Sequence, residues 1–164
     1  TAEFRTDSAI VGAQKWRGPG AIGPDGRLFF AAYQSLSSFL VVDPFFQYMA
    51  QLFGRSSFGL VLNDEKKWHG SCLGPDGNIY CTPHDATDIA VIDVDAGVGN
   101  RGDAERYTFG PSLSGLRKWQ GFNLATNGKM YAVPDFSEDI LILSGSTLNV
   151  PIPLEVCLAP YWNG

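Results

Sequence analysis

Lys67-Trp68-His69-Gly70 is one of three Lys-Trp-x-Gly segments, where x is any residue, and their spacing decides the fold. The other two are Lys15-Trp16-Arg17-Gly18 and Lys118-Trp119-Gln120-Gly121. The tryptophans of the three segments lie 52 and 51 residues apart. The fourth and last tryptophan of the chain again stands in such a triplet, Trp162-Asn163-Gly164. All tryptophans therefore mark an internal repeat, and a repeat of this length determines the whole architecture.

Each segment is followed by a turn and then by short apolar stretches. In the second repeat the turn is Gly74-Pro75-Asp76-Gly77. Asp-Gly and Asn-Gly favour a two-residue type I′ hairpin, because both central residues of that turn need a positive φ. A fourth strand is marked by Phe58-Gly59 and Phe109-Gly110, whose phenylalanines stand nine residues before the lysine of the next Lys-Trp pair. The matching turns lie at 23–26 and 125–128, second strands are expected at 27–31, 78–82 and 129–133, and third strands at 39–42, 89–92 and 140–143.

Four short antiparallel strands in each repeat predict a β-propeller blade. Kelch-like blades repeat after about 50 residues and WD-like blades after about 40–45. The predicted fold class is therefore all-β, with about three blades of four antiparallel strands in an incomplete ring. The predicted divisions are 1–14 as the last strand of a preceding blade, 15–66, 67–117 and 118–161 as blades one to three, and 162–164 as the start of a further blade.

The blade pattern, Lys-Trp-x-Gly followed by Pro-Asp-Gly-x-Ile-Tyr and Val-Ile-Asp, resembles a propeller-type repeat of uncharacterised algal and other protist proteins, and the resemblance covers nearly the whole chain. It is also similar to blades of YVTN-type and lactonase-type propellers. The resemblance implies the fold and a central channel, but no activity, because propellers host many unrelated functions. Lactonase-type propellers hold a metal with acidic and amide side chains in that channel. Asn123 is the one residue of the predicted first strands that resembles such a ligand, so we expect no metal and no cofactor.

The predicted blades start and stop within a motif. Ala2-Glu3 resembles Ala104-Glu105, which precedes the third Lys-Trp pair. The chain is therefore a piece of a longer propeller, a homodimer that completes a ring of about six blades, or a half-ring whose faces a protein partner covers. We rank these alternatives in that order. The chain starts at Thr1 rather than Met, which is consistent with removal of an upstream segment.

The composition excludes several classes of partner. The 164 residues carry a formal net charge of −5 and no basic cluster, so we expect neither nucleic acid nor an anionic membrane surface as a partner. No apolar stretch reaches the roughly 18 residues that a membrane span needs. We expect a soluble protein, and the sequence names no compartment.

The repeated lysines and the two histidines are the candidate ligand-binding residues. In a propeller the first strand of each blade is innermost, so Lys15, Lys67 and Lys118 would form a basic ring near one mouth of the channel. Alternatively each lysine is structural and packs on its tryptophan or pairs with an acid. His69 and His84 are the only histidines. They could line the same mouth, while a metal site there would need a third ligand such as Asp85, Asp88 or Asp135.

Two cysteines of the second repeat, Cys72 and Cys81, lie on neighbouring predicted strands. Counting outward from a two-residue Asp76-Gly77 turn places Cys72 directly opposite Cys81. Such pairs have Cβ atoms about 4.5–5.5 Å apart, whereas a disulfide prefers about 3.8 Å. Two free thiols or an oxidised pair are both compatible with this count.

The segment after Asp43 reads as a short helix. Asp43 is a good N-cap, Pro44 suits the first helical position, and Gly54 lies just past the end. The helix predicted at 44–53 would be apolar nearly all round, so it would pack on its own blade or contact a partner. Its predicted interface residues are Phe45, Phe46, Tyr48, Met49, Leu52 and Phe53.

Two functions from different classes follow. The first is a non-catalytic protein-interaction or scaffold module within a larger propeller or assembly, and it rests on the predicted blades that start and stop within a motif and on the apolar 44–53 segment. The second is a ligand-binding or hydrolytic, lactonase-like propeller with a site at the central channel. The sequence contains no Gly-x-Ser-x-Gly, P-loop or Gly-x-Gly-x-x-Gly motif, so we favour the first.

Overall fold

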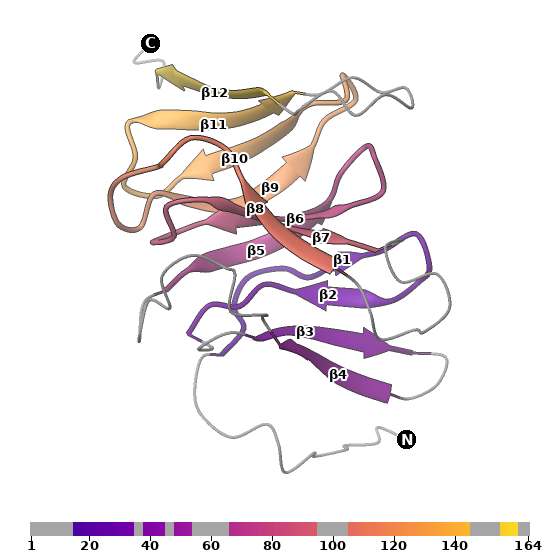
Figure 1. The fold of residues 1–164 in the computed structure, drawn as a ribbon. Coiled ribbons are helices and arrows are strands. Elements are labelled where there is room, and N and C mark those ends of the chain that lie inside the picture. The colour runs from indigo at the N-terminus through magenta and orange to yellow at the C-terminus, as the bar shows by residue number, and fades with distance from the viewer. Residues whose placement is uncertain are drawn as a thin grey trace.

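The computed structural model describes residues 15–34, 38–44, 48–53, 66–94, 105–144 and 155–160. These residues form three antiparallel sheets of four strands, each sheet in chain order, and the sheets are stacked one on the next (Figure 1). We call them blades 1, 2 and 3. Blade 1 holds β1 (Ala21–Ile22), β2 (Leu28–Phe30), β3 (Ser38–Asp43) and β4 (Tyr48–Phe53), blade 2 holds β5 (Trp68–Leu73), β6 (Ile79–Pro83), β7 (Ile89–Asp93) and β8 (Glu105–Phe109), and blade 3 holds β9 (Trp119–Leu124), β10 (Met130–Pro134), β11 (Asp139–Ser144) and β12 (Glu155–Pro160).

The prediction of an all-β fold of four-stranded repeats is confirmed. Each sheet lies within the range predicted for one blade. The first strands β1, β5 and β9 lie beside one another, so they are the inner strands, and β4, β8 and β12 are the outer ones. Phe109 ends β8 as predicted, whereas Phe58-Gly59 and the predicted flanking strands at 1–14 and 162–164 lie outside the described residues.

The hairpin between β5 and β6 has a three-residue loop, so the predicted type I′ turn is wrong. Gly77 N–H donates to the carbonyl of Gly74 at 3.2 Å, and Gly74 N–H donates to the carbonyl of Asn78 at 2.8 Å. Only Gly77 has a positive φ, of 88°, which is the pattern of a type I turn followed by a left-handed glycine. Pro75 favours this turn because its fixed φ suits the first central position of a type I turn. Blades 1 and 3 repeat these bonds at 23–27 and 125–129.

This turn shifts the strand register by one residue and separates the two cysteines. Cys81 is paired with Ser71, and Cys72 is paired with Tyr80. The side chain of Cys81 lies in the apolar cluster between blades 1 and 2, whereas Cys72 packs against the cluster between blades 2 and 3. The predicted direct pairing is therefore wrong, and because the two thiols lie on opposite faces of one sheet, both are free.

The helix predicted at 44–53 is also wrong, because Tyr48–Phe53 form the strand β4. All six residues of β4 are paired with β3, from Asp43 opposite Tyr48 to Ser38 opposite Phe53. Within the described residues no helix occurs at all, and none could cross a membrane. The helix signals at Asp43 and Pro44 are local, whereas the strand completes the sheet that the first three strands of the blade begin. The cost of leaving an edge of β3 unpaired outweighs such local preferences.

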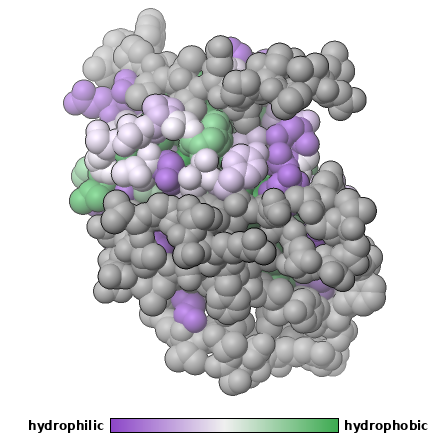
Figure 2. All heavy atoms as spheres, in the orientation of Figure 1, coloured by the Kyte–Doolittle hydropathy of each residue, from purple (hydrophilic) through white to green (hydrophobic). Residues whose placement is uncertain are grey.

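Two apolar clusters join the blades. One lies between blades 1 and 2 and includes Phe29, Trp68 and Ile92. The other lies between blades 2 and 3 and includes Val91, Trp119 and Leu143. The described surface in Figure 2 is mainly pale and purple, with green in small areas. Burial of one blade against the next therefore stabilises the stack, as expected for a repeat that cannot cover its own faces.

The repeated tryptophans fix the strands within a blade. Trp68 Nε1–H donates to the carbonyl of Asp88 at 3.0 Å, and Trp119 Nε1–H donates to that of Asp139 at 2.6 Å. Both bonds span 20 residues, from the first strand to the start of the third. The ring of Trp68 also packs on Phe39 of the preceding blade, with 5.5 Å between ring centroids. Each tryptophan thus ties its own blade together and covers its neighbour.

Candidate ligand-binding site

A β-bulge sits at each Trp-x-Gly triplet for which strand pairing is described. In blade 2 the register shifts between Trp68 and Ser71, and in blade 3 it shifts so that Gly121 has no partner residue. The three triplet glycines have φ values of 87°, 78° and 63°, which other residues rarely adopt. A bulge re-aims a side chain, and the residue re-aimed here is x. The x residues are Arg17, His69 and Gln120, of which the first and last are exposed and His69 is half-buried.

A second set of equivalent positions follows the second strand of each blade. These residues are Tyr33, His84 and Asp135, and their backbones link neighbouring blades. The carbonyl of Tyr33 accepts the N–H of Lys67 at 2.9 Å, and the carbonyl of His84 accepts the N–H of Lys118 at 2.9 Å. The backbone is the same at both junctions, while the side chains differ. Both sets of positions lie at the same end of the inner strands, opposite the hairpin turns.

Three rings from two blades meet at the junction of blades 1 and 2. Tyr33 of blade 1 is 5.7 Å from His69 and 5.6 Å from His84, measured between ring centroids, and both contacts are edge-on. The two imidazoles are 5.7 Å apart. The sequence prediction that His69 and His84 share one mouth is therefore consistent with the geometry, and Tyr33 is the residue that brings them together.

The surroundings of His69 are cationic. The Arg17 guanidinium lies over the Tyr33 ring at 5.4 Å and donates to its hydroxyl at 3.4 Å. Burial, followed by repulsion from His84 and from Arg17, lowers the pKa of His69. Nδ1 of His69 is buried and makes no hydrogen bond within the described part of the chain. A half-buried imidazole that favours its neutral form is therefore placed beside an exposed guanidinium.

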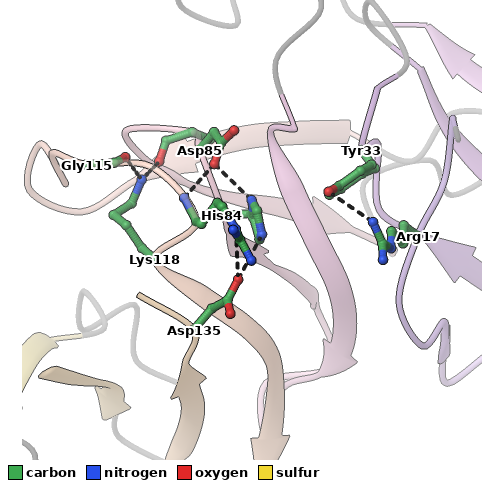
Figure 3. A network of polar contacts seen from close by, with 9 residues as sticks. Arg17, Tyr33, His84, Asp85, Gly115, Lys118 and Asp135 are labelled. Carbon is green, nitrogen blue, oxygen red and sulfur yellow. Dashed lines mark hydrogen bonds and ion pairs between the residues drawn. The ribbon is translucent and has the colours of Figure 1, made fainter. Parts of the chain in front are cut away.

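His84 belongs to a different network, which spans blades 2 and 3 (Figure 3). Its Nδ1 lies 2.9 Å from Asp85 Oδ1, and its Nε2 lies 3.5 Å from Asp135 Oδ2. Arg117 contributes a backbone N–H to Asp85 at 2.6 Å and its Nε to Asp135 at 3.5 Å. Its guanidinium also lies 3.9 Å from the centroid of the Phe136 ring. These contacts hold Arg117 at a φ of 54°, which is unusual for a residue other than glycine.

The repeated lysines are tied into the blades. Lys118 is 3% exposed, and its Nζ donates to the carbonyls of Ala86 and Gly115, both at 2.8 Å. Burial lowers the pKa of Lys118, although Asp85 and Asp88 oppose that shift. Lys67 is also buried, while Lys15 places its Nζ 5.8 Å from the ring of Trp16. The geometry of Lys118 matches the structural alternative for these lysines. Their predicted ligand-binding role is otherwise untested.

The structure describes some of the remaining candidate metal ligands and interface residues and leaves others untested. Within the described residues no group of three or more His, Cys, Asp or Glu side chains could hold a metal ion. Asn123 is exposed on β9, and burial raises the pKa of Asp88. Phe45 and Phe46 lie outside the described residues. For the other predicted interface residues, Tyr48, Met49, Leu52 and Phe53, the structure gives the strand but not the side chains.

Comparison with solved structures identifies the architecture. Virginiamycin B lyase from Staphylococcus aureus, solved as a catalytically inactive histidine-to-alanine variant with quinupristin, matches over 88% of this chain and 44% of its own, with a TM-score of 0.56 and 14% identity. The fold is that of a β-propeller. A selenomethionine form of the lyase matches over 82% of this chain and 41% of its own, with a TM-score of 0.53 and 14% identity. This chain therefore spans less than half the length of either structure.

The structural likeness is limited to the fold, because the identities are low. No protein-family model and no curated protein matches the sequence. The comparison therefore does not decide between an enzyme and a binding module. The polar positions at the blade junctions are the features that can be argued for this chain itself.

Proposed function

We propose that this chain is the ligand-binding part of a β-propeller, and that Arg17, His69 and Gln120 hold an anionic small molecule rich in hydrogen-bond acceptors. The observation that carries this proposal is the contrast within the Trp-x-Gly triplet. Tryptophan and glycine recur in all four triplets, while x is arginine, histidine, glutamine or asparagine, and a register shift re-aims x in blades 2 and 3. A residue needed only for the blade would recur as well.

The chemistry of the three side chains favours an anion. Arg17 and Gln120 are exposed donors, and arginine binds carboxylates and phosphates through two parallel hydrogen bonds. A neutral His69 with its proton on Nε2 leaves the buried Nδ1 as a lone pair and offers a further donor. Among the charges that shift the pKa of His69, the repulsive His84 and Arg17 outweigh Asp135. The Arg17 guanidinium is therefore a fixed positive charge near His69, although the whole chain is acidic.

Citrate is a suitable probe because it carries several carboxylates. We expect citrate to bind and to raise the pKa of His69, measured from its imidazole resonances by NMR. Arg17→Ala and His69→Ala should each weaken binding about tenfold or more, the usual value of one hydrogen bond to a charged group. Lys129→Ala is the matched control, because Lys129 is an exposed cation beside a hairpin turn at the other end of blade 3. Equal weakening by Lys129→Ala would reveal unspecific attraction and contradict the proposal.

The protein-interaction module remains a second proposal. It is supported by the position of β4, which is the outermost strand of blade 1 and has no partner on its outer edge among the described strands. It no longer has the support of an apolar helix. Polar replacement of Phe45, Phe46 and Met49 should abolish an association with the blades still folded. An unchanged association, or simple unfolding, would count against it.

A further inference from the structure

The two end faces of the stack differ sharply from the faces inside it. Inside, Tyr80, Ile89 and Val91 of blade 2 are fully covered by blade 3. Strand pairing makes Tyr131, Ile140 and Ile142 their equivalents in blade 3, and these are only partly buried. Thr82 is 0% exposed, whereas its equivalent Val133 is 57% exposed. The far face of blade 3 is thus an apolar blade face that no described sheet covers.

Blade 1 presents the complementary open face. Leu73 of blade 2 packs against the cluster shared with blade 1, while its equivalent in blade 1, Ile22, is 64% exposed. Ile79 and Ile92 of blade 2 are fully buried, and their equivalents Leu28 and Val42 are only partly so. One end of the stack therefore carries the face that normally receives the next blade, and the other end carries the face that normally docks on the preceding one.

We infer that a second copy of this chain docks head-to-tail, so that blade 3 of each copy packs against blade 1 of the other. The internal junctions supply the template. At the junction of blades 1 and 2 the x residue of the following blade, His69, meets Tyr33, the residue after the second strand of the preceding blade. At the proposed junction the same rule brings Arg17 to Asp135.

That pairing is complementary in charge. The Asp135 side chain is 16% exposed, while its buried Oδ2 lies 3.5 Å from His84 Nε2 and from Arg117 Nε. Arg17 is exposed. An arginine has five N–H donors, so it can bind Asp135 of the second copy and still serve the proposed ligand site. Reciprocal docking makes two identical junctions and a ring of about six blades, within the usual range of about four to eight.

The test is the solution mass by light scattering, first of the native chain and then of variants. The native chain should have twice its mass of 17.8 kDa. Val133→Asp and Ile22→Asp should each raise the dissociation constant about 30-fold or more, as loss of a central contact does. Leu116→Asp is the matched control, because Leu116 is 66% exposed but lies in the loop before β9 rather than on a blade face. Circular dichroism checks that all variants are folded.

Mixing the two variants tests the head-to-tail geometry itself. A Val133→Asp chain and an Ile22→Asp chain can form a mixed dimer in which one of the two junctions is free of substitutions. The mixed dimer carries two substitutions, as either variant dimer does, but both lie at one junction. Because the second substitution costs less at a junction that the first has already disrupted, the mixture should associate more strongly than either variant alone. A native monomer, a mass that grows beyond two copies, dimers unaffected by both variants, or a mixture without recovery would each overturn the inference.

Discussion

The junction between blades 1 and 2 and the junction between blades 2 and 3 have the same backbone and different side chains. In both, a lysine N–H donates to the residue after the second strand of the preceding blade. At the first junction Tyr33 then meets His69 beside a guanidinium, while at the second His84 lies between two carboxylates. The comparison teaches that recurring residues build the stack and that varying residues give each junction its chemistry.

Removal of a recurring tryptophan should have the largest effect. Trp119 is 2% exposed, packs between blades 2 and 3 and donates to the carbonyl of Asp139. Trp119→Ala should lower the free energy of unfolding by about 3–5 kcal/mol, the usual cost of deleting a buried aromatic side chain, and urea denaturation measures it. A loss below about 1 kcal/mol would show that this tryptophan does not hold the junction.

The triplet glycines offer the next largest effect. Gly18 and Gly77 both have a positive φ, so alanine is strained at either, by about 1–2 kcal/mol. A Cβ at Gly18 would also lie 2.6 Å from the backbone nitrogen of Gly70, whereas a Cβ at Gly77 would meet nothing within 4 Å. Gly18→Ala should therefore destabilise the chain more than Gly77→Ala in thermal unfolding. Equal losses would mean that the blades do not approach so closely.

The pH dependence of the free energy of unfolding should depend on His69, at the junction of blades 1 and 2. The pKa of His69 is lower in the folded chain than its ordinary value of 6.5. The unfolded chain therefore binds a proton more readily, and stability falls as the pH drops through 6.5 toward the folded pKa. His69→Gln should flatten this fall, whereas Lys129→Gln should leave it unchanged. A fall of undiminished size in His69→Gln would place the titrating group elsewhere.

The two cysteines of blade 2 should give the smallest effect. Because Cys72 and Cys81 face opposite sides of one sheet, oxidising conditions should not join them. Alkylation after oxidation, followed by peptide mass analysis, should find no Cys72–Cys81 disulfide, and a reductant should not change the melting temperature. Burial also raises the pKa of both thiols, so both should react slowly. Detection of that disulfide would contradict the strand register.

The blades could be predicted from the sequence because the residues that build a blade recur in each repeat. The spacing of Trp16, Trp68 and Trp119 indicated three four-stranded units, and these are present. The turn type was missed because Asp-Gly suits both a two-residue turn and a three-residue turn, and the proline before it favours the second. The strand β4 was missed because local helix signals at Asp43 and Pro44 opposed a pairing that only the whole sheet explains.

The candidate site was predicted less well because its residues differ from one repeat to the next. Recurrence drew attention to Lys118, which the structure shows bonded to two carbonyls. Tyr33 and Arg117 do not recur, and each gains its contacts to the next blade only when the blades stack, whereas Arg17 contacts Tyr33 of its own blade. Arg17 and Gln120 could have been identified from the sequence as the variable residues of the otherwise constant Trp-x-Gly triplet. For Tyr33 and Asp135 the signal is their equivalence to the histidine His84.

Lys118 and Gln120 test most directly whether recurring residues build the stack and variable residues bind the ligand. They lie two residues apart at the start of one strand, and the first recurs whereas the second varies. The measurement is a pair of values for Lys118→Met and Gln120→Ala, the free energy of unfolding and the affinity for citrate. Lys118→Met should lose about 1–3 kcal/mol of stability, because the carbonyls of Ala86 and Gly115 lose their donor, while the folded fraction still binds citrate. Gln120→Ala should change stability by less than about 0.5 kcal/mol and weaken citrate binding. The reverse result, with binding lost in Lys118→Met at full stability and an unstable Gln120→Ala, would contradict the account.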